Sequence, residues 1–423
     1  MYFVYNLLFG LGFVLALPYY LWKGRASGKY RETFRERMGA LPVYLNVDGE
    51  RSIWIHAVSV GEVLAARTLI EPLKQRFPKH RVFLSTTTVT GNAVARKSVR
   101  GLDGLFFAPL DFPWPVRKAL ETLNPALLLV METEIWPNLI HEAKRRGTKV
   151  AIANGRISPR SYPRYKRFRF FFRRVLAEVD LFLMQAGPHA QRIVAMGAPQ
   201  ERVGVPGNLK YDAVSDVRPQ ERLSRIIASR PERPLWVAGS TVAGEEALVL
   251  RAFHRVRDRV PGAALLIAPR HPERFAGIPA LVEAAGFRCR RRSDTEPGGW
   301  RNGEVLLLDT LGELAQVYPL ASAVFVGGSL VPAGGHNVLE AAVAGKPVVV
   351  GPHMENFQEI ADEFRGEGAL LQVRSAEELG DTIGALLADA PRGRELGQRA
   401  RAIIARNRGA CARTIESLAG LVA

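Results

Sequence analysis

The sequence predicts an α/β protein made of two doubly wound domains with parallel sheets, and three observations lead to that class. Short apolar runs alternate with helical segments along most of the chain, which is the order that parallel sheets require. The apolar runs are nearly continuous, as expected for strands that are buried on both faces. The length of 423 residues is too great for one ordinary domain and sufficient for two.

Each half of the chain contains a series of candidate strands. In the first half they are residues 53–58, 82–85, 126–130, 150–153 and 181–184. In the second half they are residues 235–238, 264–268, 305–308, 323–326 and 348–350. Helical segments such as 62–76 and 245–257 lie between them.

The domain boundary is expected in the polar, proline-containing stretch 208–234. We therefore expect an N-terminal anchor at 1–22, a first Rossmann-like domain at 23–210 and a second at 211–423. Ligands of such sheets bind beyond the carboxyl ends of the strands, so the two domains are expected to face each other across a cleft. The final helix, around 398–418, is a candidate to cross back onto the first domain, although periodicity alone does not show this.

The composition favours an anionic partner. Lys and Arg number 58 against 41 acidic residues, which gives a net charge of +17 and a pI near 10.2. Such a surplus is typical of proteins that meet nucleic acid, anionic lipid or phosphorylated substrates. The two cysteines, Cys289 and Cys411, form no metal-ligand pattern and fit a folded part exposed to the cytosol.

The first 22 residues contain no charged side chain and are about long enough to span a bilayer. Aromatic residues lie towards both ends of this stretch, as they do at membrane interfaces: Tyr2, Tyr5, Tyr19, Tyr20 and Trp22. Basic residues follow from Lys23, so the positive-inside rule places the rest of the chain in the cytoplasm. A cleaved signal peptide is disfavoured because no basic residue precedes the apolar run and Trp22-Lys23 is a poor cleavage site. We expect an uncleaved membrane anchor, and Pro18 leaves open a segment that lies in the membrane without crossing it.

The segment 326–356 contains the strongest signal for a ligand. An apolar strand runs into paired glycines, and a second pair leads to His336, Asn337 and a helix that carries Glu340. Glycines allow close backbone approach, and a helix N-terminus suits a phosphate. Glu340 is placed to hold ribose hydroxyls. Glycosyltransferases of the two-Rossmann (GT-B) type bind nucleotide sugars in this way; the alternative is an ordinary strand–loop–helix turn.

Carboxylates follow two strands of the first half. Glu62 lies at the turn from strand 53–58 into a helix, where it is either a general base or only a helix cap. There the helix dipole would favour its charged form and weaken it as a base. Glu132 and Glu134 follow strand 126–130, where a solvated loop is the alternative.

Basic residues follow other strands. Lys210 lies where the domains should meet and is suited to offset phosphate charge, and Arg270 follows strand 264–268. Each is a weak signal alone. The histidines lack metal-ligand spacing and no DxD motif is present, so no protein-bound metal is expected.

Residues 160–174 are basic and aromatic together. Read as a helix, the segment suits an interface with acyl chains and phosphate headgroups. A core-facing helix with a solvated basic edge and a nucleic-acid patch are the alternatives. The neighbouring apolar N-terminus favours lipid, and since no nucleic-acid motif is recognised, no nucleic-acid partner is expected.

Seven motifs along the chain together resemble the bacterial 3-deoxy-D-manno-octulosonic acid (Kdo) transferases of lipopolysaccharide synthesis. They are HAVSVGE, METEIWPN, ANGRIS, GNLKYD, APRHPERF, DTLGEL and GGSLVPAGGHNVLEAAVAGKPVVVGPHMENF. The resemblance covers nearly the whole chain. It implies an inverting GT-B transferase that moves Kdo from CMP-Kdo to the acylated, phosphorylated disaccharide precursor of lipid A at the cytoplasmic face of the inner membrane. CMP-Kdo is then the donor substrate, and no further cofactor is implied.

The resemblance also implies roles for individual residues. Glu62 matches the family's proton acceptor, and Glu132 and Lys210 match positions assigned to transition-state stabilisation. The CMP-binding stretches match Pro269, Arg270, Leu311, Gly312, Glu313, Asn337, Val338, Leu339 and Glu340. One departure is visible: family members often carry His after Gly-Ser-Thr, where this chain has Val242 and Ala243, which puts any donor contact made there in doubt.

Two other functions remain open from the sequence. Another GT-B enzyme, either a transferase of lipid-linked sugars or an epimerase using a UDP-sugar, would share the region around Glu340 but would not be expected to carry HAVSVGE or METEIWPN. A membrane-anchored scaffold that binds nucleotide sugars without turnover would not need Glu62.

Overall fold

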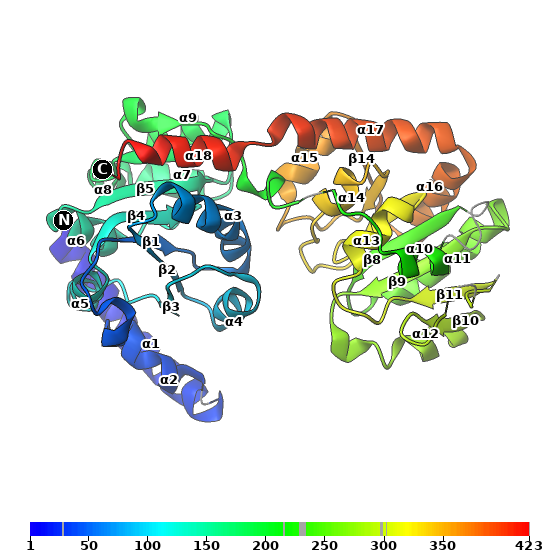
Figure 1. Cartoon of the computed structure of the whole chain (residues 1–423), viewed down its shortest axis with the longest axis horizontal. Helices are drawn as coiled ribbons and strands as arrows, with labels where there is room; N and C mark the ends of the chain where they lie inside the picture. The colour runs from blue at the N-terminus through cyan, green and yellow to red at the C-terminus, as the bar shows by residue number, and fades with distance from the viewer. Residues whose placement is uncertain (28, 215, 228–233, 297–298, 302, 423) are drawn as a thin grey trace. The chain divides into compact units, whose positions relative to one another are not determined.

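The computed structural model describes residues 1–27, 29–214, 216–227, 234–296, 299–301 and 303–422. The chain forms two compact units (Figure 1). Unit 1 comprises Met1–Ala213 together with Asn407–Ala423, and unit 2 comprises Val214–Arg406.

Unit 1 contains a seven-stranded sheet in the order β3-β2-β1-β4-β5-β6-β7, and every pair of neighbours is parallel. The strands are β1 (Ser52–His56), β2 (Arg81–Thr86), β3 (Gly104–Phe107), β4 (Pro125–Met131), β5 (Lys149–Gly155), β6 (Leu181–Met184) and β7 (Val203–Gly204). Its helices are α1 (Tyr2–Ser27), α2 (Lys29–Arg37), α3 (Val60–Arg76), α4 (Val89–Ser98), α5 (Pro113–Leu123), α6 (Pro137–Arg145), α7 (Tyr162–Arg167), α8 (Arg169–Leu176), α9 (Gly187–Met196) and α18 (Ala410–Ala419).

Helices cover both faces of this sheet because side chains alternate along each strand. Trp54 of β1 points to the face covered by α5, α6, α8 and α9. Its neighbours Ile53 and Ile55 point to the opposite face, where α3, α4 and α18 pack. Burial on both faces explains why these strands read as continuous apolar runs in the sequence.

Unit 2 repeats this plan with the order β10-β11-β9-β8-β12-β13-β14, also parallel throughout. The strands are β8 (Leu235–Thr241), β9 (Ala264–Pro269), β10 (Arg288–Arg291), β11 (Glu304–Leu307), β12 (Ala323–Val326), β13 (Val348–Val350) and β14 (Leu370–Gln372). The helices are α10 (Glu221–Ile227), α11 (Glu245–Arg259), α12 (Ile278–Ala284), α13 (Leu314–Val317), α14 (Leu339–Val343), α15 (Gln358–Gly366), α16 (Ala376–Ala388) and α17 (Ala390–Asn407).

The two parallel sheets confirm the predicted α/β class, and each strand expected from the sequence is present. The strands that the sequence did not reveal are β3, β7, β10 and β14, which form the two edges of each sheet. An edge strand pairs on one side only and need not be apolar throughout. Thus β10 reads RCRR and β7 has only two residues.

The C-terminal helix expected around 398–418 is in fact two helices, α17 and α18. The break occurs at Gly409, whose φ of 87° is left-handed and ends a regular helix. The carboxylate of Asp212 accepts the N–H groups of Gly409 at 2.7 Å and Cys411 at 2.6 Å, and Arg413 donates to the carbonyl of Pro206 at 2.7 Å. These contacts bind α18 to unit 1 (Figure 1).

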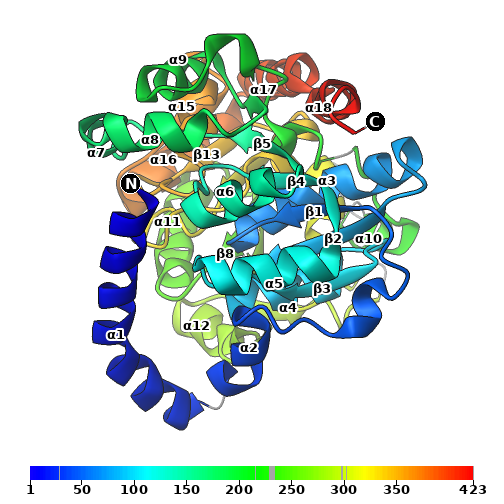
Figure 2. The same ribbon diagram turned by 90° about the vertical axis from the view of Figure 1, so that its left-hand side faces the viewer.

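The apolar N-terminus forms α1 (Figure 2). Polar contacts hold its first turns to the rest of unit 1. The hydroxyl of Tyr2 donates to Glu178 at 2.8 Å, that of Tyr5 donates to Asp111 at 2.7 Å, and the amide of Asn138 donates to Asn6 at 2.6 Å.

The bilayer-spanning anchor expected at 1–22 is not supported. In the described part of the chain, no helix is both long enough and apolar enough to cross a membrane. The hydrogen bonds of their hydroxyl groups explain the two tyrosines at the start of α1 without a membrane interface. A role at the membrane interface was also expected for Tyr19, Tyr20 and Trp22, but their side chains lie outside the part of the chain that the structure describes.

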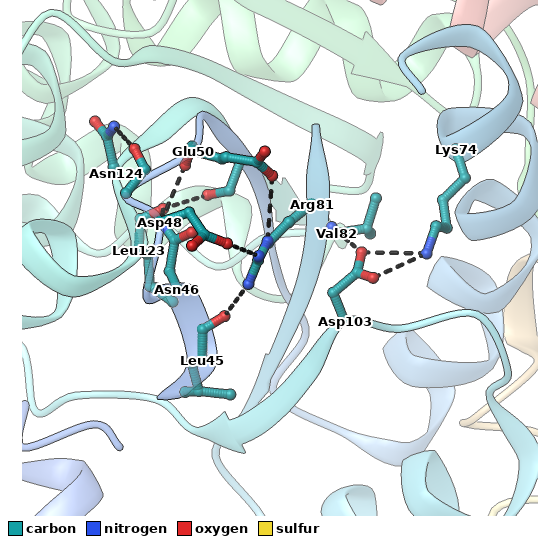
Figure 3. Close-up of polar contacts among 12 residues, drawn as sticks. Leu45, Asn46, Asp48, Glu50, Lys74, Arg81, Val82, Asp103, Leu123 and Asn124 are labelled. Carbon is teal, nitrogen blue, oxygen red and sulfur yellow. Dashed lines mark hydrogen bonds and ion pairs between the residues drawn. The ribbon is translucent and has the colours of Figure 1, made fainter. Parts of the chain in front are cut away.

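Ion pairs and hydrogen bonds join the elements at the amino ends of the unit 1 strands (Figure 3). The guanidinium of Arg81 donates to Asp48 at 2.7 Å and to the carbonyl of Leu45 at 3.1 Å. Asp103 accepts from Lys74 at 3.0 Å and from the N–H of Val82 at 2.7 Å. This edge is therefore stabilised by contacts within the protein, and the candidate functional residues lie at the opposite, carboxyl edge.

Candidate active site

Three side chains that the sequence singled out lie at the carboxyl edge of the unit 1 sheet. Glu62 is in the first turn of α3, directly after β1, and Glu132 directly follows β4. Because β1 and β4 are hydrogen-bonded neighbours, both carboxylates emerge at the same edge. Lys210 joins them from the short 3-10 turn η3 (Leu209–Tyr211), which follows β7.

Glu62 both caps a helix and has the electrostatic surroundings of a base. Its carboxylate accepts the N–H of Val58 at 2.8 Å and the hydroxyl of Ser59 at 2.7 Å. The hydroxyl of Ser59 in turn accepts the N–H of Glu62 at 3.4 Å, which completes a reciprocal cap. The two roles that the sequence left open for Glu62, helix cap and general base, therefore do not exclude each other.

Burial raises the pKa of Glu62 to about 7. The hydrogen bonds from Val58 and Ser59 lower it, and the negative charges of Glu134 and Glu132 raise it. Weakening of Glu62 as a base, expected from the helix dipole, is therefore opposed by its surroundings, because loss of solvent outweighs the hydrogen bonds that stabilise its charged form. A pKa near neutrality suits a general base.

Glu132 and Lys210 form an ion pair, with 3.3 Å between Nζ and Oε1 and side chains that are 15% and 19% exposed. The backbone of Glu132 has a φ of 54°, which is rare for a residue other than glycine. Such strain is found mainly at functional sites, where the surrounding structure holds it.

Glu134 is held by an aromatic neighbour. The indole N–H of Trp136 donates to its carboxylate at 2.8 Å, and the same ring packs edge-on against His56, with 4.6 Å between centroids. His56 is fully buried, and its Nδ1 lies 2.9 Å from the hydroxyl of Ser85. Trp136 therefore packs against a buried ring and also orients Glu134, which is half-buried and not in a solvated loop.

The donor residues expected from the sequence follow the carboxyl ends of the unit 2 strands. Pro269 ends β9, and Arg270 beside it is exposed. Leu311 is 65% exposed in the loop after β11, and Gly312 adopts a left-handed φ of 83°. In the same loop, Glu313 is already paired with Arg292 at 3.0 Å.

The remaining expected donor residues surround the start of α14. Asn337 lies two residues before this helix begins, and its Oδ1 accepts the N–H of Leu339, the first helical residue, at 3.1 Å. Its Nδ2 donates to Glu340 at 3.4 Å. Val338 and Leu339 are fully buried, backbone included, and the N–H of Leu339 is already bound by Asn337.

The loop that follows β12 differs from the expected phosphate cradle. The N–H groups of Gly328, Ser329 and Leu330 donate to the carboxylate of Glu245 at 2.6, 2.9 and 2.8 Å. A Cβ at Gly327 would lie 2.6 Å from the carbonyl oxygen of Ser240, so glycine is needed here for contact with the protein's own backbone. These three donors are satisfied internally and are not offered to a phosphate.

Sequence reasoning missed this arrangement. Glu245 and Glu246 begin the helical segment expected at 245–257, where acidic residues are usually exposed, yet both are fully buried. The carboxylate of Glu246 binds both guanidinium nitrogens of Arg274, at 2.5 and 2.7 Å, and accepts the hydroxyl of Thr241 at 2.8 Å. The sequence does contain two adjacent acidic residues after one strand and a basic residue after the next. Which of them pair is decided by the sheet, because it brings the ends of the two strands together.

Among the described residues, no group of three or more His, Cys, Asp or Glu side chains is arranged to hold a metal ion.

Comparison with known proteins agrees with the motifs. Residues 32–213 match the model of the 3-deoxy-D-manno-octulosonic-acid transferase (kdotransferase) family, and residues 302–403 match that of glycosyl transferases group 1. The 3-deoxy-D-manno-octulosonic acid transferase of Haemophilus influenzae is 35% identical over 93% of this chain and 92% of its own length. That of Bordetella pertussis is 35% identical over 93% of both chains.

One solved structure shows the fold. The putative UDP-N-acetylglucosamine 2-epimerase of Listeria monocytogenes superposes with a TM-score of 0.58 over 87% of this chain and 96% of its own, at 13% identity. Such low identity supports only the two-domain, Rossmann-like GT-B architecture. The 35% identity to curated transferases over 93% of the chain shows more: this protein belongs to the family of 3-deoxy-D-manno-octulosonic acid (Kdo) transferases and is a glycosyltransferase.

Proposed function

We propose that the protein transfers Kdo from CMP-Kdo to a sugar hydroxyl of the acylated disaccharide precursor of lipid A, with inversion at the anomeric carbon. The observation that carries the proposal is Glu62, a carboxylate only 5% exposed whose pKa is raised to about 7. It lies at the same sheet edge as the ion pair of Glu132 and Lys210.

In the proposed reaction, Glu62 takes the proton of the acceptor hydroxyl. The acceptor oxygen forms a bond to the anomeric carbon of Kdo while the bond from that carbon to the CMP phosphate breaks, and CMP leaves with the electron pair. Positive charge develops on the sugar and negative charge on the departing phosphate. Glu132 is assigned to the first charge and Lys210 to the second, because groups aimed at developing charge lower the barrier most.

The proposal assigns the nucleotide to unit 2. Arg270 is exposed and always charged, which suits the phosphate of CMP. Glu340 is partly exposed in the first turn of α14 and suits ribose hydroxyls. Glu313 is paired with Arg292, and Val338 and Leu339 are fully buried, so the proposal assigns these three residues to holding the donor site in shape.

We assign the membrane contact to unit 1, on the cytoplasmic side. Unit 1 carries 34 Lys and Arg against 17 Asp and Glu, whereas unit 2 carries 24 of each, so the net charge of +17 belongs to unit 1. A surplus confined to one unit favours an anionic lipid surface.

The side of α1 that faces away from unit 1 supports the same assignment. Its apolar side chains are more than half exposed: Phe3, Val4, Leu7, Leu8, Leu11, Val14 and Leu15. Phe168 and Phe170, in the basic segment of α7 and α8, are 47% and 73% exposed. We propose that α1 lies in the plane of the cytoplasmic leaflet, with these side chains among the acyl chains.

Mass spectrometry of a lipid A precursor incubated with CMP-Kdo tests the proposal. The wild-type product should be heavier by one or more Kdo units. Glu62→Ala should lose about 10²- to 10⁴-fold in rate, which is the usual contribution of a general base, while CMP binding measured by calorimetry stays unchanged.

Glu71→Ala is the matched control, because Glu71 lies on the same helix and is exposed. If Glu62→Ala transfers Kdo at the wild-type rate, Glu62 is not the general base. Absence of transfer by folded wild-type protein that binds CMP would point to another acceptor.

A further inference from the structure

Two neighbouring strands of unit 1 end in the same unusual backbone conformation. Glu132 follows β4 with a φ of 54°, and Asn154 lies near the end of β5 with a φ of 55°. The two strands pair directly, and the N–H of Glu132 donates to the carbonyl of Ala153 at 2.9 Å. Asparagine tolerates left-handed backbone better than most residues, so Asn154 is suited to its conformation and Glu132 is not.

The side chain of Asn154 holds the turn that carries Lys210. It is 1% exposed, and its Oδ1 accepts the N–H of Leu209 at 3.0 Å. Leu209 is the first residue of η3 and is fully buried, and Tyr211 at its end is 2% exposed. The turn is therefore held by packing on both sides of Lys210 and by the amide of Asn154 beneath it.

Two further amides complete a set of hydrogen bonds around this turn. Gln185, which follows β6, donates to the carbonyl of Asn154 at 2.9 Å. Asn208 donates to Oε1 of Gln185 at 3.1 Å, and its own Oδ1 accepts the N–H of Lys210 at 3.0 Å. The backbone of Lys210 is thus connected through three neutral amides to β5, the strand whose end also holds Glu132.

We propose that Asn154, together with Gln185 and Asn208, positions Lys210 against Glu132 for the transfer step. The inference rests on the catalytic role proposed for Lys210. None of the three amides need touch the substrate, so they are positioning residues.

The chemistry of the amide fits this role. Asn154 uses its oxygen as an acceptor, and its buried Nδ2 has no partner among the described residues. A carboxylate would accept the N–H of Leu209 equally well, but it would add a negative charge to an edge that already carries Glu62, Glu132 and Glu134. A neutral acceptor holds the turn without competing with Glu132 for Lys210.

The decisive test is a double-mutant cycle between Asn154→Gly and Lys210→Met. Glycine accepts the positive φ, so this change removes the hydrogen bond without adding backbone strain. Asn124→Gly is the matched control: Asn124 also has a left-handed φ, of 44°, and donates to the carbonyl of Gly49 at 2.7 Å, but it lies at the amino edge of the sheet (Figure 3). Rates of Kdo transfer, KM for the donor and thermal unfolding are measured for each variant.

We expect Asn154→Gly to lower kcat by about tenfold to a hundredfold with little change in KM, as misplacement of a catalytic group does. The double variant should be no slower than Lys210→Met alone, and Asn124→Gly should keep the wild-type kcat. Gln185→Met removes the second amide and keeps a side chain of similar volume, so it should lower kcat as Asn154→Gly does. It replaces Asn154→Gly in the cycle if that variant fails to fold.

The outcomes separate this inference from the function on which it rests. If Lys210→Met is slow but Asn154→Gly keeps the wild-type kcat, or if the two losses multiply in the double variant, the positioning role is wrong and the role of Lys210 stands. If Lys210→Met keeps the wild-type kcat, the proposed role of Lys210 is itself wrong, and the positioning inference falls with it.

Discussion

The carboxylate of Glu245 accepts the backbone N–H of Gly328 at 2.6 Å, within a loop whose glycines suggested a phosphate cradle. The N–H groups of Val242, Ser329 and Leu330 point to the same carboxylate. A carboxylate of the protein thus fills the anion-binding loop and holds it in shape. In the proposed donor site, phosphate recognition is left to other groups, of which Arg270 is the strongest candidate.

Glu245→Gln should destabilise unit 2 and weaken CMP binding. Glutamine keeps one acceptor oxygen, but its NH2 group leaves two of the four N–H groups without an acceptor, and leaving such buried donors unpaired costs on the order of 3 kcal/mol. Thermal unfolding and calorimetric titration with CMP measure the two effects. Glu378→Gln is the control, because Glu378 is an exposed carboxylate in the first turn of α16 that accepts the N–H of Arg374 at 2.8 Å. Equal effects from both variants would contradict a special role for Glu245.

The rate of transfer should depend on pH through Glu62. A general base is active when deprotonated, so kcat/KM should rise as pH increases through about 7, the value to which burial raises the pKa of Glu62, and level off above it. Glu134→Gln should move the midpoint to lower pH, because the negative charge of Glu134 raises that pKa. The pH profiles of both proteins are compared with that of Glu121→Gln, an exposed residue of α5. An unshifted midpoint in Glu134→Gln would show that Glu134 does not act on the base.

Binding to vesicles should depend on α1. Replacing Leu7 and Leu11, which are 61% and 58% exposed, by Asp puts charge among the acyl chains and should lower affinity for phosphatidylglycerol vesicles by at least about tenfold. Flotation or sedimentation measures the bound fraction. Leu281→Asp tests an exposed leucine of unit 2 and should leave binding unchanged. Salt should weaken binding of the wild type, since screening reduces the contribution of unit 1's charge. Wild-type affinity in the Leu7 and Leu11 variant would exclude α1 from the contact.

Asp212→Ala should loosen α18. Asp212 accepts the N–H groups of Gly409 and Cys411 at the start of this helix, and the loss of such a cap costs about 1 kcal/mol. Hydrogen exchange should speed up in 410–419 and stay unchanged in α16. Asp381→Ala, which removes an exposed ion pair with Arg255, provides the comparison. Unchanged protection of α18 would mean that apolar contacts such as those of Ile415 and Leu418 hold it alone.

The sequence by itself determined the fold class, the central strands and the family. Strands buried on both faces are continuous apolar runs, so β1, β4, β8 and β12 could be predicted from the sequence alone. The motifs that follow β1, β4 and β9 placed Glu62, Glu132 and Arg270 at strand ends, since the carboxyl ends of parallel strands are where loops carry function. Local order along the chain is sufficient for all of these inferences.

Only the tertiary structure decided what those residues contact. The edge strands were hidden because pairing on one side requires little hydrophobicity, and the break at Gly409 depends on a backbone angle. The pKa of Glu62 depends on how much solvent the packed edge excludes. The pairing of Glu245 with Gly328 joins the helix after β8 to the loop after β12, and these two strands are neighbours only in the sheet. The hydrogen bond from Leu209, beside Lys210, to Asn154 likewise connects residues 55 positions apart. Burial and long-range hydrogen bonds arise from packing, and no local pattern in the sequence encodes them.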